Sequence, residues 1–229
     1  DRWKERDPNW KPAAYQKEQD PIRGVFAYIA DGLLQPGEEA PAHQPQLLPG
    51  QVKLKNINGD DKLNEEDMVL IGRNDPKFIF GFNNNFSYKN FDLNIYMYGQ
   101  VGKIAGANSY YDAWGSYGNR IKLGQNVPVS FKDAWSSDNQ TSTRPSFIES
   151  AYGTGDLFLQ KISFLRIRNI TLGYTVPISK SICNRLRVYA DVNNPCVWTN
   201  WKGQDPETDS NTNAYPNVTS FSIGVDISF

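Results

Sequence analysis

The chain has 229 residues, and its 24 basic and 25 acidic residues give a formal net charge of −1 at pH 7. This balance excludes the basic footprint of a nucleic-acid-binding protein. The only histidine, His43, lies in a proline-rich segment, which argues against His-based catalytic triads and most His-ligand metal sites. Carboxylate pairs such as Glu65 and Glu66 are adjacent on a polar segment with no sign of a cleft. We therefore expect no enzymatic activity.

The first distinctive segment, Asn56–Asp67, resembles a twelve-residue calcium loop. Calcium requires such loops because several oxygen ligands must converge from one short turn. Asp61 replaces the usual turn glycine, and Asp67 replaces the usual bidentate glutamate. The alternative is a rigid turn whose side chains bond their own backbone. The candidate ligands, which include the backbone carbonyl of Lys62, are Asn56, Asn58, Asp60, Lys62, Asn64 and Asp67.

Two segments with the two-residue period of β-strands follow, at 77–88 and 91–100. The joint between them, Lys89 and Asn90, has the length of a tight hairpin turn. The apolar positions are Phe78, Phe80, Phe82, Phe86 and Tyr88 in one segment and Phe91, Leu93, Ile95 and Met97 in the other. The intervening positions are mostly polar or small, so each strand has one apolar and one polar face.

The long connection 101–156 carries aromatic residues among glycine, asparagine and serine. Flat aromatic faces beside amide donors suit the capture of sugars or peptides. Packing inside a large loop and contact with a partner protein remain alternatives. The candidate substrate-binding residues are Tyr110, Tyr111, Trp114, Tyr117 and Trp135.

Three further strands are predicted at 164–176, 185–194 and 219–229. In 164–176 the apolar register changes, which predicts a bulge near Asn169. The last strand alternates without a break and is long enough to cross the apolar layer of an outer membrane. Four charged residues lie in the polar register of these strands and are expected to face a lumen and pair there: Arg166, Arg168, Arg187 and Asp191.

The lengths of the connections between the strands give evidence about the fold that is independent of the hydrophobic pattern. The joints 89–90 and 178–184 are short, whereas 31–75, 101–156 and 195–218 are long. In an antiparallel sheet all the long connections then lie at one end, as in outer-membrane barrels, which have short periplasmic turns and long extracellular loops. We predict that the three long ranges are extracellular loops. A soluble β-sandwich gives no reason for this sorting.

Five or six strands cannot close a transporter-sized barrel, and the sequence opens on Asp1 without an initiator methionine or a signal peptide. We therefore expect residues 1–229 to be the C-terminal part of a longer barrel protein. Cys183 and Cys196 are separated by a full strand, which is too far for a disulfide. Two free thiols are predicted. The tryptophans Trp198 and Trp201 follow a strand end, which favours anchoring at the membrane interface.

Several segments resemble the C-terminal strands of SusC-like TonB-dependent transporters, the RagA/SusC family. They include Thr-Leu-Gly-Tyr-Thr-Val-Pro at 171–177, Asp-Val-Asn-Asn-Pro at 191–195 and Trp-Lys-Gly-Gln-Asp-Pro-Glu at 201–207. Upstream, 28–33, 56–60 and 71–78 are similar to the preceding loop and strand of that family. The matches follow the family's order from about residue 22 to residue 229.

The resemblance implies an all-β protein, part of an antiparallel transmembrane barrel of about 22 strands with an N-terminal plug. It also implies residence in the outer membrane of Bacteroidota and import of glycan or peptide oligomers. The implied partners are TonB, through an N-terminal part not contained in this sequence, and a SusD-like lipoprotein that acts as a lid. No cofactor is expected apart from the calcium candidate. A soluble or surface-attached carbohydrate-binding β-sandwich and a barrel that only scaffolds partners remain alternatives.

Overall fold

The computed structural model describes residues 9, 11–17, 20–106, 123–124, 126–127, 129–147, 150–178, 183–203, 205–208 and 214–229. The chain divides into two compact units. The first, which we call the loop unit, comprises residues 1–75, 104–160 and 210–212. The second, which we call the sheet unit, comprises residues 76–103, 161–209 and 213–229.

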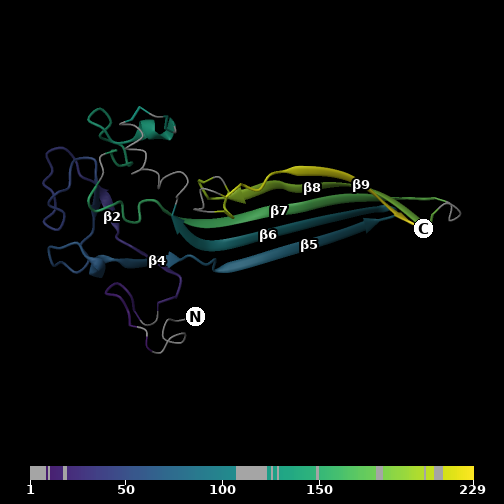
Figure 1. Cartoon of the computed structure of the whole chain (residues 1–229), viewed down its shortest axis with the longest axis horizontal. Coiled ribbons are helices and arrows are strands. Elements are labelled where there is room, and N and C mark those ends of the chain that lie inside the picture. The colour runs from purple at the N-terminus through teal and green to yellow at the C-terminus, as the bar shows by residue number, and fades with distance from the viewer. Residues whose placement is uncertain are drawn as a thin grey trace. The chain divides into compact units, whose positions relative to one another are not determined.

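The sheet unit is built on five long strands: β5 (Phe78–Tyr88), β6 (Phe91–Gly106), β7 (Leu159–Val176), β8 (Arg185–Thr199) and β9 (Ser220–Ser228). They form one sheet in chain order, β5-β6-β7-β8-β9 (Figure 1). The β5–β6, β7–β8 and β8–β9 ladders are antiparallel. All five predicted strands are confirmed, as is the all-β antiparallel fold class.

Three strands are longer than their sequence pattern indicates. β6 continues to Gly106 instead of ending at Gln100, β7 begins at Leu159, and β8 ends at Thr199. The hydrophobic alternation weakens at Gly99 and Gly102 in β6, at the polar residues Gln160 and Lys161 in β7, and at Pro195 in β8. Backbone pairing does not depend on side-chain polarity, so the strands continue. The predicted end of β7 before Pro177 is confirmed.

The predicted bulge is confirmed in position. The β7–β8 register shifts between Ile167 and Asn169, which pair with Cys196 and Asn193 respectively. Over this step β8 therefore carries one residue more than β7, so the extra residue lies in β8 and not in β7. Asn194 has a φ of 48°, the left-handed conformation that asparagine adopts readily. The bulge also explains why Pro195 is tolerated inside a strand.

The apolar face of the sheet is uncovered. Phe221, Ile223 and Val225 on β9 are 77%, 85% and 54% exposed, and no second layer of described residues covers them. Figure 1 shows the five strands as a single twisted layer. A soluble sandwich would bury this face against another sheet. The arrangement is instead the one expected of a sheet whose apolar side meets lipid.

The two ends of the sheet differ as the connection lengths predict. β5, β7 and β9 run in the same direction, so the Lys89–Asn90 turn, the β7–β8 connection and the C-terminus lie at one end (Figure 1). The connections from β6 to β7 and from β8 to β9 lie at the other end. The assignment of this second end to the cell exterior stays a prediction.

The loop unit is folded, although its range 31–75 was expected as a single loop. β1 (Gly24–Ala27) pairs with β4 (Val69–Arg73), and β2 (Ala30–Leu33) pairs with β3 (Val52–Leu54). Two short 3₁₀ helices, η1 (Glu65–Asp67) and η2 (Val129–Asp133), complete it. A small core of Leu33, Val52 and Leu54 is packed by Tyr28, Ala30, Leu63, Trp135 and Tyr152. In the described ranges, no helix combines the length and the apolar character needed to cross a membrane.

Candidate functional site

The polar face of the sheet unit carries ion pairs between strands. Arg187 on β8 donates from Nε and Nη2 to the carboxylate of Asp92 on β6, at 2.9 and 2.5 Å, and from Nη1 to Asp226 on β9, at 2.9 Å. To reach Asp92 it crosses β7 at Gly173, where a Cβ atom would collide with both side chains. A glycine is therefore required at this crossing. The predicted pairing of Arg187 is confirmed.

Asp191, the predicted lumenal carboxylate, is held by neutral partners. Its carboxylate accepts hydrogen bonds from Thr171 at 2.7 Å, from Asn193 at 2.6 Å and from Asn169. These three hydrogen-bond donors stabilise the negative charge of the Asp191 carboxylate, so it needs no cation as a partner. A structural role accounts for this group.

A second ion cluster fixes the segment after β8 to β7. Arg166 and Asp205 are each 3% exposed and are paired at 2.8 Å. Glu207 lies 3.4 Å from Arg166 and 3.5 Å from Arg168. The backbone N–H of Asn217 donates to Asp205 at 2.8 Å. The predicted pairing of inward charges is therefore confirmed for both arginines, with partners in the loop that follows β8.

The pKa of Asp205 is lowered. Burial alone would raise it, but the N–H groups of Glu207 and Asn217 and the charge of Arg166 outweigh this effect. The carboxylate is therefore ionised under all ordinary conditions. Its charge is compensated within the cluster.

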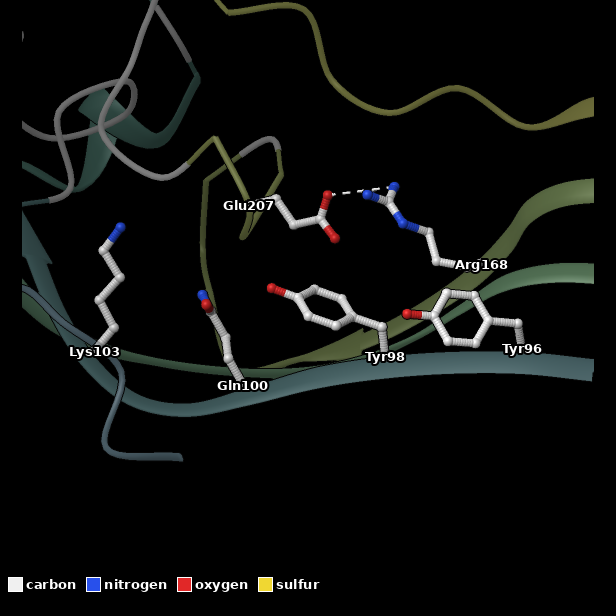
Figure 2. A pocket seen from close by; sticks show the side chains of 6 residues that line it. All are labelled: Tyr96, Tyr98, Gln100, Lys103, Arg168 and Glu207. Carbon is white, nitrogen blue, oxygen red and sulfur yellow. Dashed lines mark ion pairs between the residues drawn. The ribbon is translucent and has the colours of Figure 1, made fainter. Parts of the chain in front are cut away.

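Beside this cluster the sheet unit forms an open polar pocket of about 310 Å³ (Figure 2). β6 contributes Tyr96, Tyr98, Gln100 and Lys103, while Arg168 comes from β7 and Glu207 from the segment after β8. Its lining is dominated by polar groups, and the two tyrosine rings lie side by side in Figure 2. This volume is at the lower end of the range of small-molecule pockets.

Sequence reasoning missed this pocket because it looked for aromatic residues in the long connections. The available signal was in β6, where Tyr96 and Tyr98 occupy the polar register beside Asn94 and Gln100. The contribution of Glu207 depends on how the segment after β8 folds back, which no local pattern predicts.

The predicted aromatic site is only partly described. Tyr110, Tyr111, Trp114 and Tyr117 lie outside the described residues. Trp135 packs on Gly50 and on the Leu33 core, and its indole N–H donates to Gln35 at 3.4 Å. This matches the loop-packing alternative, and ligand contact by these aromatic residues stays a prediction.

The two tryptophans after β8 differ from each other. Trp198 is 56% exposed, as an interfacial anchor requires. Trp201 is 6% exposed and lies against Gly203, so the expectation of an interfacial role for Trp201 is wrong. Cys183 and Cys196 are both free thiols, as predicted.

The calcium candidate is held together by its own backbone bonds. Asp67 accepts N–H bonds from Ile57 at 2.8 Å and from Asn64 at 3.0 Å. Asn56 accepts from the N–H of Gly59 at 2.5 Å, and Asp60 accepts from the N–H of Lys62 at 3.0 Å. The arrangement is the Asx-turn alternative, in which the side-chain oxygens already have donors.

No group of three or more His, Cys, Asp or Glu side chains in the described part of the chain is placed to hold a metal ion. Burial alone would raise the pKa of Asp67, but N–H bonds from Asn64, Ile57 and Asn58 and the nearby His43 lower it on balance. Asp67 is thus an ionised cap of this turn. Calcium binding at 56–67 stays a prediction.

Replacing Asp67 by alanine should loosen residues 56–67 by about 1–3 kcal/mol, because the half-buried N–H groups of Ile57, Asn58 and Asn64 lose their acceptor. Glu65→Ala is the matched control, since that side chain is exposed on the same short helix. Hydrogen exchange of this segment measures the difference. Added calcium should change neither wild-type nor variant protection; strong protection by calcium in the wild type alone would favour the metal alternative.

No family model matches the chain. Over 93% of its length it is 27% identical to TonB-dependent receptor P3 of Formosa agariphila, covering 23% of that protein. It is 28% identical to TonB-dependent receptor P26 of the same organism, over 81% of the chain and 20% of that protein. It is also 27% identical to TonB-dependent receptor SusC of Bacteroides thetaiotaomicron, over 75% of the chain and 17% of that protein.

The chain is thus similar in sequence to SusC-like TonB-dependent receptors. It spans no more than about a quarter of the length of these curated relatives. Its fold is similar to a solved structure of the RagAB peptide transporter, with a TM-score of 0.68 and 21% identity over 90% of this chain and 23% of the other. The RagAB peptide importer in its open-open state gives a TM-score of 0.65 at 22% identity, again over 90% of this chain and over 22% of the other.

The likeness to TonB-dependent receptors agrees with the predicted location in the bacterial outer membrane. The uncovered apolar face of β5–β9 fits this location, because lipid is the medium that such a face requires. The polar face, with its ion clusters and its pocket, then belongs to the aqueous side.

Proposed function

We propose that the protein to which this chain belongs imports glycan or peptide oligomers across the outer membrane. The observation that carries the proposal is the two-sided sheet: apolar side chains on β9 are uncovered, while charges on the other face pair across β6, β8 and β9. A barrel built from such strands encloses a polar conduit. The likeness to TonB-dependent receptors supports energy supply through TonB.

A SusD-like lipoprotein is the proposed partner on the extracellular side. The solved neighbours are described as RagAB complexes, which supports a two-component arrangement for this protein as well. The long connections 101–156 and 195–218 are the proposed extracellular surface. Contact between their aromatic residues and either cargo or the lipoprotein is part of this proposal.

Catalysis is not part of the proposed function. The relatives are receptors and transporters. The Nε2–H of His43 donates to the Leu54 carbonyl at 2.7 Å, so this side chain serves the packing of the loop unit. The carbohydrate-binding β-sandwich is not favoured, because no described layer covers Phe221, Ile223 and Val225.

The test uses the source bacterium with and without the full-length gene. Cells receive fluorescently labelled oligosaccharides and, separately, labelled casein peptides. Accumulation of one class should be lost in the deletion strain and also when the proton-motive force is collapsed. A lipoprotein should copurify with the detergent-extracted receptor. Unchanged accumulation of both classes in the deletion strain would contradict the proposal.

A further inference from the structure

Residues 205–208, which we call the strap, lie over the polar face of the sheet unit instead of extending away from its end. The chain leaves β8 and turns back onto β7, where Asp205 pairs with Arg166 at 2.8 Å. Glu207 lines the pocket together with four side chains of β6. Figure 2 shows Glu207 across the pocket from Tyr98. The strap therefore reaches from β8 across β7 to the space above β6.

The strap is fixed at one point together with the returning part of the same connection. Asp205 accepts N–H bonds from Glu207 at 2.9 Å and from Asn217 at 2.8 Å. The side-chain amide of Asn217 donates to Glu207 at 2.7 Å, and its carbonyl oxygen accepts from Arg168 on β7 at 3.3 Å. The outgoing and the returning parts of the β8–β9 connection are thus tied to each other and to β7.

The burial of this ion cluster indicates that the strap has a single position. Arg166 and Asp205 are each 3% exposed, and Pro206 between Asp205 and Glu207 is fully buried. A buried ion pair adds little net stability, because both charges lose their hydration, but separating its partners is strongly unfavourable. The strap is therefore held against β7 as a fixed element and not as a flap that swings freely.

Between the strap and β6 the sheet unit leaves the open pocket of about 310 Å³. Its lining consists of Tyr96, Tyr98, Gln100, Lys103, Arg168 and Glu207. The β6 and β7 members of this set lie on the polar face, which the proposed import function assigns to the conduit. In a closed barrel, a segment that lies on the inner face occupies part of the cross-section open to cargo. The strap therefore narrows the conduit along this wall.

We propose that the strap is a fixed constriction that limits the width of the imported oligomer. An unbranched oligomer passes between Glu207 and the β6 wall, whereas a branched one meets the strap. Glu207 is the specificity-determining residue, and Arg166 and Asp205 are positioning residues that hold it in place. The inference rests on the proposed import function and adds a selection by width that applies to glycan and peptide cargo alike.

The first experiment compares two probes of equal composition in cells that make the full-length receptor. Both are the oligomer class that accumulates in the uptake assay, with the same fluorophore on either a terminal or an internal residue, where it acts as a branch. Wild type should accumulate the terminally labelled oligomer about 5-fold or more above the internally labelled one, because a constriction selects by width.

Asp205→Ala loosens the strap and should reduce this ratio to below about 2-fold. Asp226→Ala is the matched control, since it removes another carboxylate of the polar face that pairs with Arg187 on β8, away from the strap. This control should keep the wild-type ratio. Heat-resistant mobility in detergent checks that each variant receptor is folded.

The second experiment locates the strap by cross-linking. Gln100→Cys is combined with Glu207→Cys in the full-length receptor, and cells are treated with a flexible bismaleimide. Mass spectrometry should find the two peptides linked, and uptake of the terminally labelled oligomer should fall about 10-fold or more, because the linker fills the gap. Ser87→Cys with Glu207→Cys should give no linked pair, since Ser87 lies on the polar face near the far end of β5. Each single-cysteine variant treated in the same way should change uptake less than about 2-fold.

Absence of a link from Glu207→Cys to both Gln100→Cys and Tyr96→Cys would overturn the position of the strap over β6. Unchanged uptake after cross-linking, equal accumulation of the two probes in wild type, or an unchanged ratio in Asp205→Ala would overturn the width limit. Each of these results would leave the import function standing, because that function depends on loss of accumulation in the deletion strain. Equal accumulation with and without the gene would instead overturn the import function, and the width limit with it.

Discussion

Replacing Asp205 by alanine should destabilise the segment after β8 by about 3–5 kcal/mol, because it leaves Arg166 as a buried charge without its closest partner. Both side chains are 3% exposed, and the pair is joined at 2.8 Å. Asp205 also accepts the backbone N–H groups of Glu207 at 2.9 Å and of Asn217 at 2.8 Å. Its loss therefore frees several donors at once.

Hydrogen exchange of the full-length receptor measures this effect locally, in peptides that contain 205–208 and 214–217. The double variant Arg166→Met with Asp205→Leu is the informative control, since removing both charges avoids the unpaired cation. It should recover most of the protection that Asp205→Ala loses. Equal protection in wild type and Asp205→Ala would show that the ion pair does not anchor this segment.

The same carboxylate predicts a pH dependence. The pKa of Asp205 is lower in the folded state than in the unfolded state, where it is about 3.9. The stabilisation it provides is therefore fully present above that unfolded value and is lost as the pH falls through the folded value. Protection of 205–208 should decline below about pH 4 in the wild type, and Asp205→Asn should show a weaker decline.

The strands were predictable because their pattern reflects two different solvents. β5 and β9 alternate almost without interruption, and each residue is sorted by the medium it meets. The ends of β6 and β8 were not predictable, since Gly99, Gly102 and Pro195 interrupt the pattern while the backbone ladder continues. The start of β7 was missed because Gln160 and Lys161 are polar. Hydrophobic periodicity depends on the medium that each side chain meets, whereas strand pairing depends on the geometry of the backbone.

The polar site was predictable only in part. The inward position of Arg166 and Arg187 followed from their register, but their partners did not. Asp205 is 39 residues from Arg166, and Asp92 is 95 residues from Arg187. The need for Gly173 becomes visible only when Arg187 is seen to cross β7. Long-range pairing of this kind depends on strand order and loop return, which a single sequence does not encode locally.

Val225→Arg should destabilise the barrel by about 2–4 kcal/mol, because an arginine near the middle of β9 would face hydrocarbon. Val225 pairs with Val188 on β8, and both belong to the apolar face. Equilibrium unfolding of the full-length receptor in lipid vesicles measures the change. If the protein were a soluble sandwich, Val225→Arg would lower its stability by disrupting a dry core. Such a protein would also remain soluble without detergent.

Ser222→Arg is the control that isolates lipid exposure, since Ser222 lies on the opposite face of the same strand and pairs with Asp191. An arginine there meets water and a carboxylate, so its effect should stay within about 1 kcal/mol. The two substitutions introduce the same side chain three residues apart in β9. A difference of at least about 2 kcal/mol between them is expected only if the two faces meet different media, and equal effects would contradict a lipid-facing Val225.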